Sequence, residues 1–569
     1  MKKIKYYIGI LSLICFSASC SDYLDIDKKT DTSINYDEIF KNPHTAPGFL
    51  NNAYNKLTDG FDRGIGGELL AVASDEAKFS KSGGVMQFFN NNAISPSYNP
   101  DDVWSSMYEG IRKCNIFLKE MDPDKGLIAK YNSIPAASRD NYRGQAYFLR
   151  AYFHFELLKR YQNIIFVDKV LDPNNEAEIY SFPQIPFAQA VDRIAQDCDS
   201  AIRLLPAKYD AAKNAEMIGR PTKAAPMALK SRMFLYAASP LNNPTNDVAL
   251  WERAETAAAA IYTQAGDLGL GLLDKGAYAE IFTSPNNKEV IFATGARERN
   301  DIERYNFPIS FQGNGLVNPT QDLVDTYVMK STSYANPMNG YDPENPYTGR
   351  EDRFYASIIY NDMIFKGNKV ETFVEGKDGL NSTATATKTG YYLKKFSVES
   401  INLEKGDVIY RQWILFRYAE VLLNYAEARN EVLAAPDKTI HDLLNLIRLR
   451  AGLRNFSNAS QYIKSKEEMR DYIKLERRKE LAFEDHRFWD LRRWKDADAL
   501  AKTITGMRIV KVADGVDGNG TPKYKFTYTP FNVEKRLFDT KLYWYPIPRT
   551  EILKYANKGI TLNQNPGWN

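Results

Sequence analysis

Apolar side chains recur every three or four residues along much of the chain, the spacing that places them on one face of an α-helix. Met107, Ile111, Cys114 and Leu118 follow this pattern behind acidic residues suited to a helix N-terminus. Comparable patterns predict helices over residues 101–120, 138–160, 187–205, 222–238, 249–262, 413–432, 439–451 and 466–494. We therefore expect a mainly α-helical protein.

Small side chains lie where neighbouring helices must approach closely. Ala224, Ala225 and Ala228 share one predicted helix, and Ala254 and Ala258 lie in the next. This composition is typical of closely packed antiparallel helix pairs of the tetratricopeptide-like type. No fixed repeat period accompanies it, so we expect helical hairpins and not a regular array.

Helical periodicity lapses between residues 266 and 411, where Pro, Gly, Asn and Tyr are dense. This region is predicted to be a loop-rich insert with short strands, and residues 379–390 a surface loop. Further along, R-I-V-K-V and K-Y-K-F-T-Y-T flank the turn-rich A-D-G-V-D-G-N-G-T-P, which predicts a C-terminal β-hairpin. Asp514, Asp517 and Asn519 in this turn miss the offsets of a calcium-binding loop.

The first residues have the layout of a lipoprotein signal peptide: a basic start, a short apolar run and S-A-S-C ending at Cys20. We expect cleavage before Cys20 and lipid on its thiol; an ordinary secretory signal with a chance cysteine is the alternative. The predicted organisation is a signal peptide (1–19), an acidic tether (20–41) and one globular unit (42–569), comprising an N-terminal helical region (42–265), the insert (266–411) and a C-terminal helical region (412–569).

Charge and cysteine content narrow the classes of function. Without the three lysines of the signal peptide, the 74 Lys and Arg residues fall to the number of Asp and Glu residues, 71. A neutral chain lacks the basic excess that drives nucleic-acid binding. Only Cys114 and Cys198 follow Cys20, too few for a disulfide scaffold, and we expect both to be buried and inert.

Catalytic and metal-binding motifs are weak in this sequence. Glu476, Glu480 and Glu484 share a helix face, and paired carboxylates are what glycoside hydrolysis requires. Interleaved arginines favour ionised acids in salt bridges, so a hydrolase acting through Glu480 and Glu484 is the less favoured hypothesis. The four histidines are widely spaced, and nucleophile-elbow, phosphate-loop and dinucleotide motifs are absent, so no catalytic residue, metal or cofactor is predicted.

Aromatic residues mixed with amide and hydroxyl side chains are the more informative feature. A sugar ring offers an apolar face to an aromatic plane and hydroxyl groups to Asn, Gln, Asp or Arg, so this mixture suits carbohydrate binding. Two clusters supply the ligand-binding candidates Phe79, Phe88, Phe89, Asn91 and Tyr98, and Tyr305, Phe311, Asn314, Tyr341 and Tyr347.

Several motifs in order resemble the SusD/RagB family of outer-membrane lipoproteins. They are C-S-D-Y-L-D, S-D-E, W-S-S-M-Y-E-G-I-R-K-C-N-I-F-L, R-G-Q-A-Y-F-L-R-A-Y-F-H-F-E-L-L-K-R-Y, P-T-Q-D-L-V-D-T-Y, R-Y-A-E-V-L-L-N-Y-A-E-A-R-N-E, E-R-R-K-E-L-A-F-E-D-H-R-F-W-D-L-R-R-W and Y-P-I-P-R-T-E-I…N-Q-N-P-G-W. The resemblance covers nearly the whole chain, and its specificity lies in the order of the motifs.

This resemblance implies a scaffold of four tetratricopeptide-like hairpins under a loop-rich ligand face. It also implies non-catalytic capture of oligosaccharides, anchoring in the outer membrane facing the exterior, and a SusC-like, TonB-dependent barrel as partner. The RagB branch handles peptides, so an oligopeptide ligand is the alternative. Family aromatics lie in loops after S-D-E and in the insert, where this chain holds the two clusters above. Neither cluster contains a tryptophan, because Trp104 belongs to the following helix.

Overall fold

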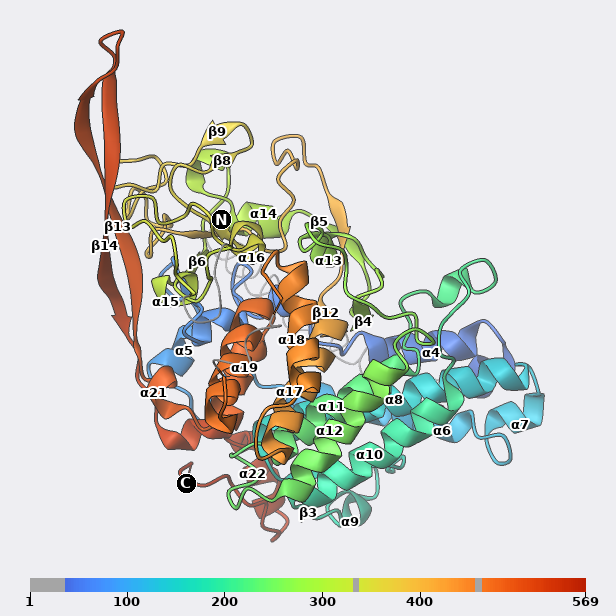
Figure 1. The fold of residues 1–569 in the computed structure, drawn as a ribbon. Coiled ribbons are helices and arrows are strands. Elements are labelled where there is room, and N and C mark those ends of the chain that lie inside the picture. The colour runs from blue at the N-terminus through green and yellow to red at the C-terminus, as the bar shows by residue number, and fades with distance from the viewer. Residues whose placement is uncertain (1–35, 331–336, 456–462, 569) are drawn as a thin grey trace, which may run out of the picture.

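Helices of the N-terminal half stack side by side in chain order (Figure 1). The computed structural model describes residues 36–330, 337–455 and 463–568. The long helices of this half are α4 (Thr45–Tyr54), α6 (Trp104–Glu120), α8 (Ala136–Tyr161), α10 (Phe187–Leu204), α11 (Ala224–Ala238) and α12 (Val248–Thr263). Each contacts the next, and α12 contacts α17 (Tyr418–Val432). The five helices predicted here are confirmed, with ends that agree within three residues.

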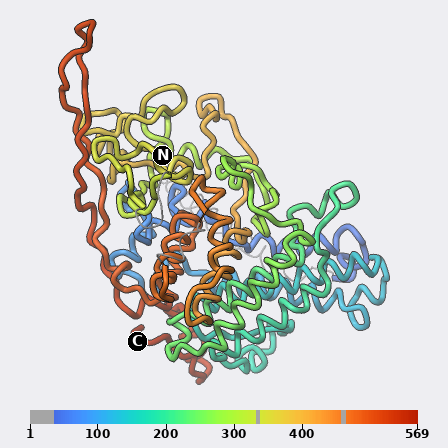
Figure 2. The backbone as a smooth tube through the Cα atoms, in the orientation of Figure 1, coloured from blue at the N-terminus to red at the C-terminus, as the bar shows by residue number. Residues whose placement is uncertain are grey.

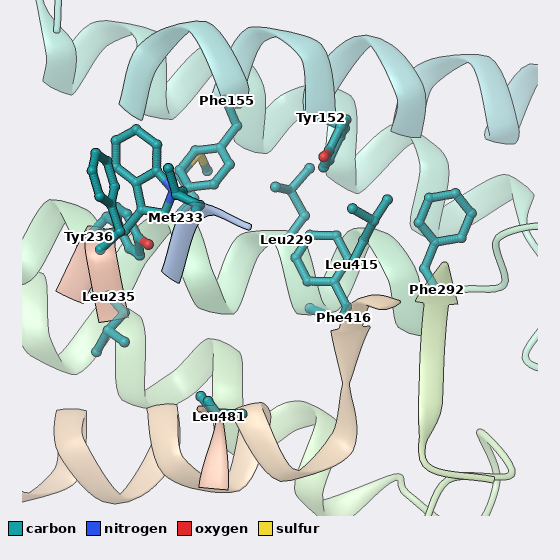
Figure 3. Packing of buried hydrophobic residues seen from close by; sticks show 14 of the residues in the cluster. Tyr152, Phe155, Leu229, Met233, Leu235, Tyr236, Phe292, Leu415, Phe416 and Leu481 are labelled. Atoms are coloured by element: carbon teal, nitrogen blue, oxygen red, sulfur yellow. The ribbon is translucent and has the colours of Figure 1, made fainter. Parts of the chain in front are cut away.

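The core forms where α8 and α11 approach each other. In Figure 3, Tyr152 and Phe155 of α8 lie near Leu229 and Met233 of α11, and all four are buried. Helix α8 is enclosed by α6 on one side and α10 on another, which explains why its second half is buried all round. The predicted close packing of α11 and α12 is confirmed, because the two helices contact each other and the small residues Ala228, Ala254 and Ala258 are buried.

The packed region begins earlier than the sequence indicated. Helix α3 (Tyr36–Lys41) falls inside the predicted tether, yet Phe40 is fully buried. Its ring lies 5.8 Å from that of Phe49 and 6.0 Å from that of Phe117. The globule therefore includes residues from 36 onward, because an apolar ring in this segment finds a pocket between α4 and α6.

The C-terminal helices are α17, α18 (Lys438–Arg450), α19 (Lys466–Glu480), α20 (His486–Arg493), α21 (Ala497–Leu500) and α22 (Arg549–Ala556). Helix α17 begins at Tyr418 and not at residue 413, because β12 (Ile414–Arg417) pairs with β4 (Val290–Ala293). Helix α18 confirms the predicted helix at 439–451. A capping box of Ser465 and Glu468 begins α19.

The single helix predicted over residues 466–494 is wrong, since α19 and α20 are separate. Phe483 and Asp485 both have φ of 65° in the segment between them. Distant side chains hold this break: Lys395 donates to the Ala482 carbonyl at 2.8 Å, and Glu76 accepts the Phe483 N–H at 3.2 Å. These bonds replace the helical ones that the local sequence favours.

The insert contains short elements, as predicted. Its helices are α13 (Glu280–Thr283), α14 (Asp301–Asn306), α15 (Gln321–Val324) and α16 (Asp352–Ser357), and its strands are β4, β5 (Arg297–Arg299), β6 (Val317–Pro319), β7 (Ile358–Ile359), β8 (Ile364–Phe365), β9 (Asn368–Lys369), β10 (Tyr392–Leu393) and β11 (Ile409–Arg411). Elsewhere the described short elements are β1 (Ala77–Phe79), β2 (Ile164–Ile165), β3 (Gln184–Ile185), α5 (Gln87–Asn90), α7 (Leu127–Tyr131) and α9 (Glu176–Ile179). Antiparallel pairing of β1 with β6 joins the S-D-E region to the insert.

The predicted hairpin is confirmed as β13 (Thr503–Val516) and β14 (Pro522–Lys535). Its outer half extends beyond the rest of the molecule, as the tube in Figure 2 shows. In its turn, Asp517 accepts the backbone N–H groups of Asn519 and Thr521, so this carboxylate closes the turn. Over the described ranges, His, Cys, Asp and Glu form no group of three or more suited to a metal ion, and no helix is long and apolar enough to span a bilayer.

Candidate functional site

Burial separates the aromatic candidates into two groups. The rings of Phe79, Phe89, Phe311 and Tyr347 lie in the core, where 3–8% of each residue is exposed. Phe89, for example, packs edge-on against Phe488 at 5.1 Å between ring centroids. Stacking on a ligand requires an open ring face, so these four residues cannot act as surface platforms in this structure.

Three further candidates are more open but belong to the insert. Tyr305 is partly buried against Gly67, and a guanidinium group, that of Arg350, lies 5.0 Å from the ring centroid of Tyr341. The side chain of Asn314 is exposed. The cavity described next is built without these residues.

A cavity of about 340 Å³ lies beside Tyr98, between the loop after α5 and the start of α22. Tyr98 is 43% exposed, and the ring of Phe88 supports it at a centroid distance of 4.8 Å. The Arg549 N–H donates to the Pro96 carbonyl at 2.8 Å and joins the two walls. The lining residues are Ser95, Pro96, Ser97, Tyr98, Asn99, Asp102, Pro546, Pro548, Arg549, Thr550 and Leu553. We call this the Tyr98 cavity.

Polar groups without protein partners point to a ligand here. Asn99 Oδ1 accepts the Asp101 N–H at 3.0 Å, but the buried Nδ2 group of Asn99 has no hydrogen-bond partner among the described residues. The guanidinium group of Arg549 likewise makes no ion pair in the described part of the chain. A buried donor left unpaired costs about 1–3 kcal/mol, which water or a ligand hydroxyl group would recover.

One acid of the cavity is fixed by the scaffold. Asp102 Oδ1 accepts the Trp104 N–H at 3.0 Å and the hydroxyl group of Tyr161. This arrangement orients the carboxylate at the start of α6 and leaves its second oxygen for other donors. The cavity therefore combines an open aromatic ring, an amide donor, a guanidinium group and an oriented carboxylate, the set that binds sugar hydroxyl groups.

The carboxylates considered for hydrolysis have a structural role. Glu480 is fully buried and Glu484 is 7% exposed. Arg417 binds both, with Nη1 2.7 Å from Glu480 and Nε 2.6 Å from Glu484. Burial alone would raise the pKa of Glu480, but Arg450, Arg417 and Arg353 hold this pKa well below its ordinary value. The predicted salt-bridged state of these acids is confirmed, but their arginine partners come from distant parts of the chain and not from the arginines interleaved with them in sequence.

The cysteine predictions divide between described and undescribed residues. Cys114 and Cys198 are free and buried, as expected, and burial raises the pKa of both thiols. Such thiols are inert. Cys20 and the signal peptide lie outside the described residues, so lipidation at Cys20 stays a prediction.

Sequence reasoning found Tyr98 but missed the facing wall. Arg549 and Thr550 lie in Y-P-I-P-R-T, one of the motifs that carry the family resemblance, and neither residue was among the ligand-binding candidates. They are more than 440 positions from Tyr98 in sequence, and only the tertiary fold brings them to it. In the sequence, the one indication of this wall is that a hydrogen-bonding pair, Arg549 and Thr550, directly follows the two prolines of P-I-P.

The chain is a mainly α-helical scaffold with a small polar and aromatic cavity, which is the architecture of a ligand-binding protein. Comparison with known proteins identifies its family. The SusD family model matches residues 288–568, and a SusD-like model described as starch-binding and associating with the outer membrane matches residues 22–235. The chain belongs to the SusD/RagB family.

Relatives resemble the chain over most of its length. SusD-like protein P38 of Formosa agariphila is 24% identical over 551 residues, which cover 89% of this chain and 95% of that protein. A SusD-like crystal structure from Bacteroides fragilis has a TM-score of 0.72 at 27% identity and covers 93% of this chain and 98% of its own. A second structure from that organism, described as a SusD-like carbohydrate-binding protein, has a TM-score of 0.70 at 24% identity and covers 90% and 98%.

Proposed function

We propose that this chain is a non-catalytic, cell-surface glycan-binding lipoprotein, which captures oligosaccharides and delivers them to a SusC-like, TonB-dependent transporter in the outer membrane. The observation that carries the binding role is the Tyr98 cavity, where an open ring lies beside the unpaired amide donor of Asn99. Family membership supports the wider role, since one matching model is described as starch-binding and associating with the outer membrane.

Capture is proposed to be weak and without turnover. Stacking adds about 0.5–1.5 kcal/mol per ring beyond burial, so one or two rings with a few hydrogen bonds give an affinity of roughly millimolar to micromolar. Turnover through Glu480 and Glu484 is disfavoured because both carboxylates are buried in ion pairs. An oligopeptide ligand is also disfavoured. The second Bacteroides fragilis structure named above is described as a carbohydrate-binding protein, and this description favours a saccharide ligand.

Calorimetric titration of the mature chain without lipid tests the proposal. The panel consists of maltooligosaccharides, laminarin oligosaccharides, xylooligosaccharides and oligogalacturonates, with a tripeptide mixture beside them. We expect at least one saccharide to bind without being cleaved, and Tyr98→Ala to weaken it about five- to tenfold through loss of stacking.

Tyr410→Ala is the matched control, because Tyr410 is 58% exposed on β11 and does not line the cavity. Its affinity should equal that of the wild type. Silence against every saccharide, or equal losses in the two variants, would contradict the proposed function. Release of shorter products from a bound saccharide would contradict its non-catalytic part.

A further inference from the structure

A second cavity, of about 430 Å³, lies where the end of α8 meets the C-terminal segment. Trp544 is partly exposed in its wall, and Gln162, Lys495 and Thr540 lie around it. We call it the Trp544 cavity. It contains the tryptophan that the two predicted aromatic clusters lack.

Four polar groups in this wall have no hydrogen-bond partner among the residues that the structure describes. They are the indole N–H of Trp544, the side-chain amide of Gln162, the Thr540 hydroxyl group and the ammonium group of Lys495, none of which hydrogen-bonds to a described residue. The other face of the wall is well anchored, since the Trp568 indole donates to the carbonyl groups of Lys541 and Trp544. A rigid frame thus presents open donors and acceptors to one space.

The backbone at Gln162 adds an independent observation. Gln162 has φ 63° and ψ −73°, and the Asn163 N–H donates to the Tyr161 carbonyl at 2.7 Å. These values define a classic γ-turn centred on Gln162, a rare and strained conformation. Lys495 also has a positive φ, of 58°. Glycine would adopt both conformations without strain, yet these two positions hold Gln162 and Lys495, whose side chains line the cavity.

The charges of the cavity indicate the kind of ligand. Lys541 Nζ lies 3.9 Å from Asp539, which leaves Lys495 as the cation without an ion pair among the described residues. A free ammonium group beside an indole ring, an amide and a hydroxyl group complements a sugar that carries a carboxylate.

We propose that the Trp544 cavity is a second saccharide site, which takes a uronate residue of the captured glycan. It rests on the proposed glycan capture. The two cavities share one scaffold, because Tyr161 donates to Asp102 in the Tyr98 cavity while the next residue, Gln162, lines the Trp544 cavity. The two sites are therefore separate cavities built on one scaffold.

Titration with trigalacturonate tests the second site, with maltotriose and triglutamate as comparison ligands. The variants Gln162→Gly and Lys495→Gly remove the lining side chains and relieve backbone strain, so both are expected to fold. We expect each to weaken trigalacturonate about five- to tenfold, and Lys495→Gly also to reduce the salt dependence of binding. Asn132→Gly is the control, because Asn132 is exposed with φ 47° at the end of α7.

Each result decides the inference. The inference is overturned if trigalacturonate binds the wild type and both variants with equal affinity, or if it binds none of the three proteins. It is also overturned if triglutamate binds and trigalacturonate does not. Tyr98→Ala separates this failure from that of the proposed function: saccharide binding that depends on Tyr98 but not on Gln162 defeats only the second site. Absence of all saccharide binding defeats both.

Discussion

At the scale of single residues, the Glu68 carboxyl group lies fully buried under the loop that carries Val85 and Met86. It accepts their backbone N–H groups at 2.8 and 3.0 Å. Burial raises the pKa of Glu68 to about 7 from 4.5, although these two bonds act in the opposite direction. The folded protein therefore holds a proton here that the unfolded chain releases between pH 4.5 and 7.

This proton linkage predicts how stability depends on pH. Because the folded state binds more protons in that window, the contribution of Glu68 to the free energy of unfolding falls as pH rises and reaches its minimum above pH 7. Glu68→Gln cannot titrate, so its stability relative to wild type should rise from pH 5 to pH 8. Urea unfolding across this range measures it, with the exposed Glu216→Gln as control. A pH-independent difference for Glu68→Gln would refute the linkage.

Residue burial also explains why the site could be predicted only in part. Tyr98 and Phe89 have similar polar and aromatic neighbours in sequence, yet one ring is exposed and the other packs against Phe488. Local composition does not report which face of a loop the core will cover. The partners that complete the Tyr98 cavity, including Arg549, come from the far end of the chain.

At the scale of secondary-structure elements, the β13–β14 hairpin depends on its base. Asp322 of α15 accepts the backbone N–H and the hydroxyl group of Thr505 at 2.7 and 2.8 Å, and pairs with Lys502. A two-stranded ribbon alone is marginally stable in water. The contacts of Asp322 therefore help to hold a ribbon whose outer half extends into solvent (Figure 1).

Asp322→Ala is expected to loosen this hairpin. Losing the acceptor of two hydrogen bonds should cost about 1–3 kcal/mol locally, so trypsin should cut faster at Arg508, Lys511, Lys523 or Lys525 in the ribbon. Mass spectrometry of early fragments locates the cuts. Asp274→Ala is the control, since the Asp274 side chain is 92% exposed. Unchanged cleavage in Asp322→Ala would show that the hairpin does not need this anchor.

The elements also show how far sequence periodicity reaches. Helices such as α10 and α11 were predicted almost to the residue, because an apolar stripe is a local signal. The break between α19 and α20 was missed, because it depends on Lys395, far away in the insert. The pairing of β12 with β4 is likewise non-local and turned a predicted helical turn into a strand.

At the scale of the whole molecule, buried ion pairs connect the insert to the C-terminal helices. Arg417 contacts Glu289 of the insert at 2.9 Å and Glu480 of α19 at 2.7 Å. Arg353 of α16 contacts Glu476 and Glu480 at 2.7 and 3.1 Å. All these side chains are at most 1% exposed. Buried charges of the insert are therefore paired with residues of the C-terminal region, although Arg353 also pairs with Glu351 inside the insert.

A shared charge network predicts that the insert and the helical regions unfold together. Arg417→Met leaves several buried carboxylates short of a partner and should destabilise the protein by about 3–5 kcal/mol. Scanning calorimetry should show one transition in wild type and variant, with equal calorimetric and van't Hoff enthalpies and a lower midpoint in the variant. Arg253→Met is the control: its ion pair with Asp192 is at the surface, 40% and 59% exposed, and should be worth about 1 kcal/mol or less. Two separate transitions would show instead that the insert folds independently, and the predicted single unit would then be wrong.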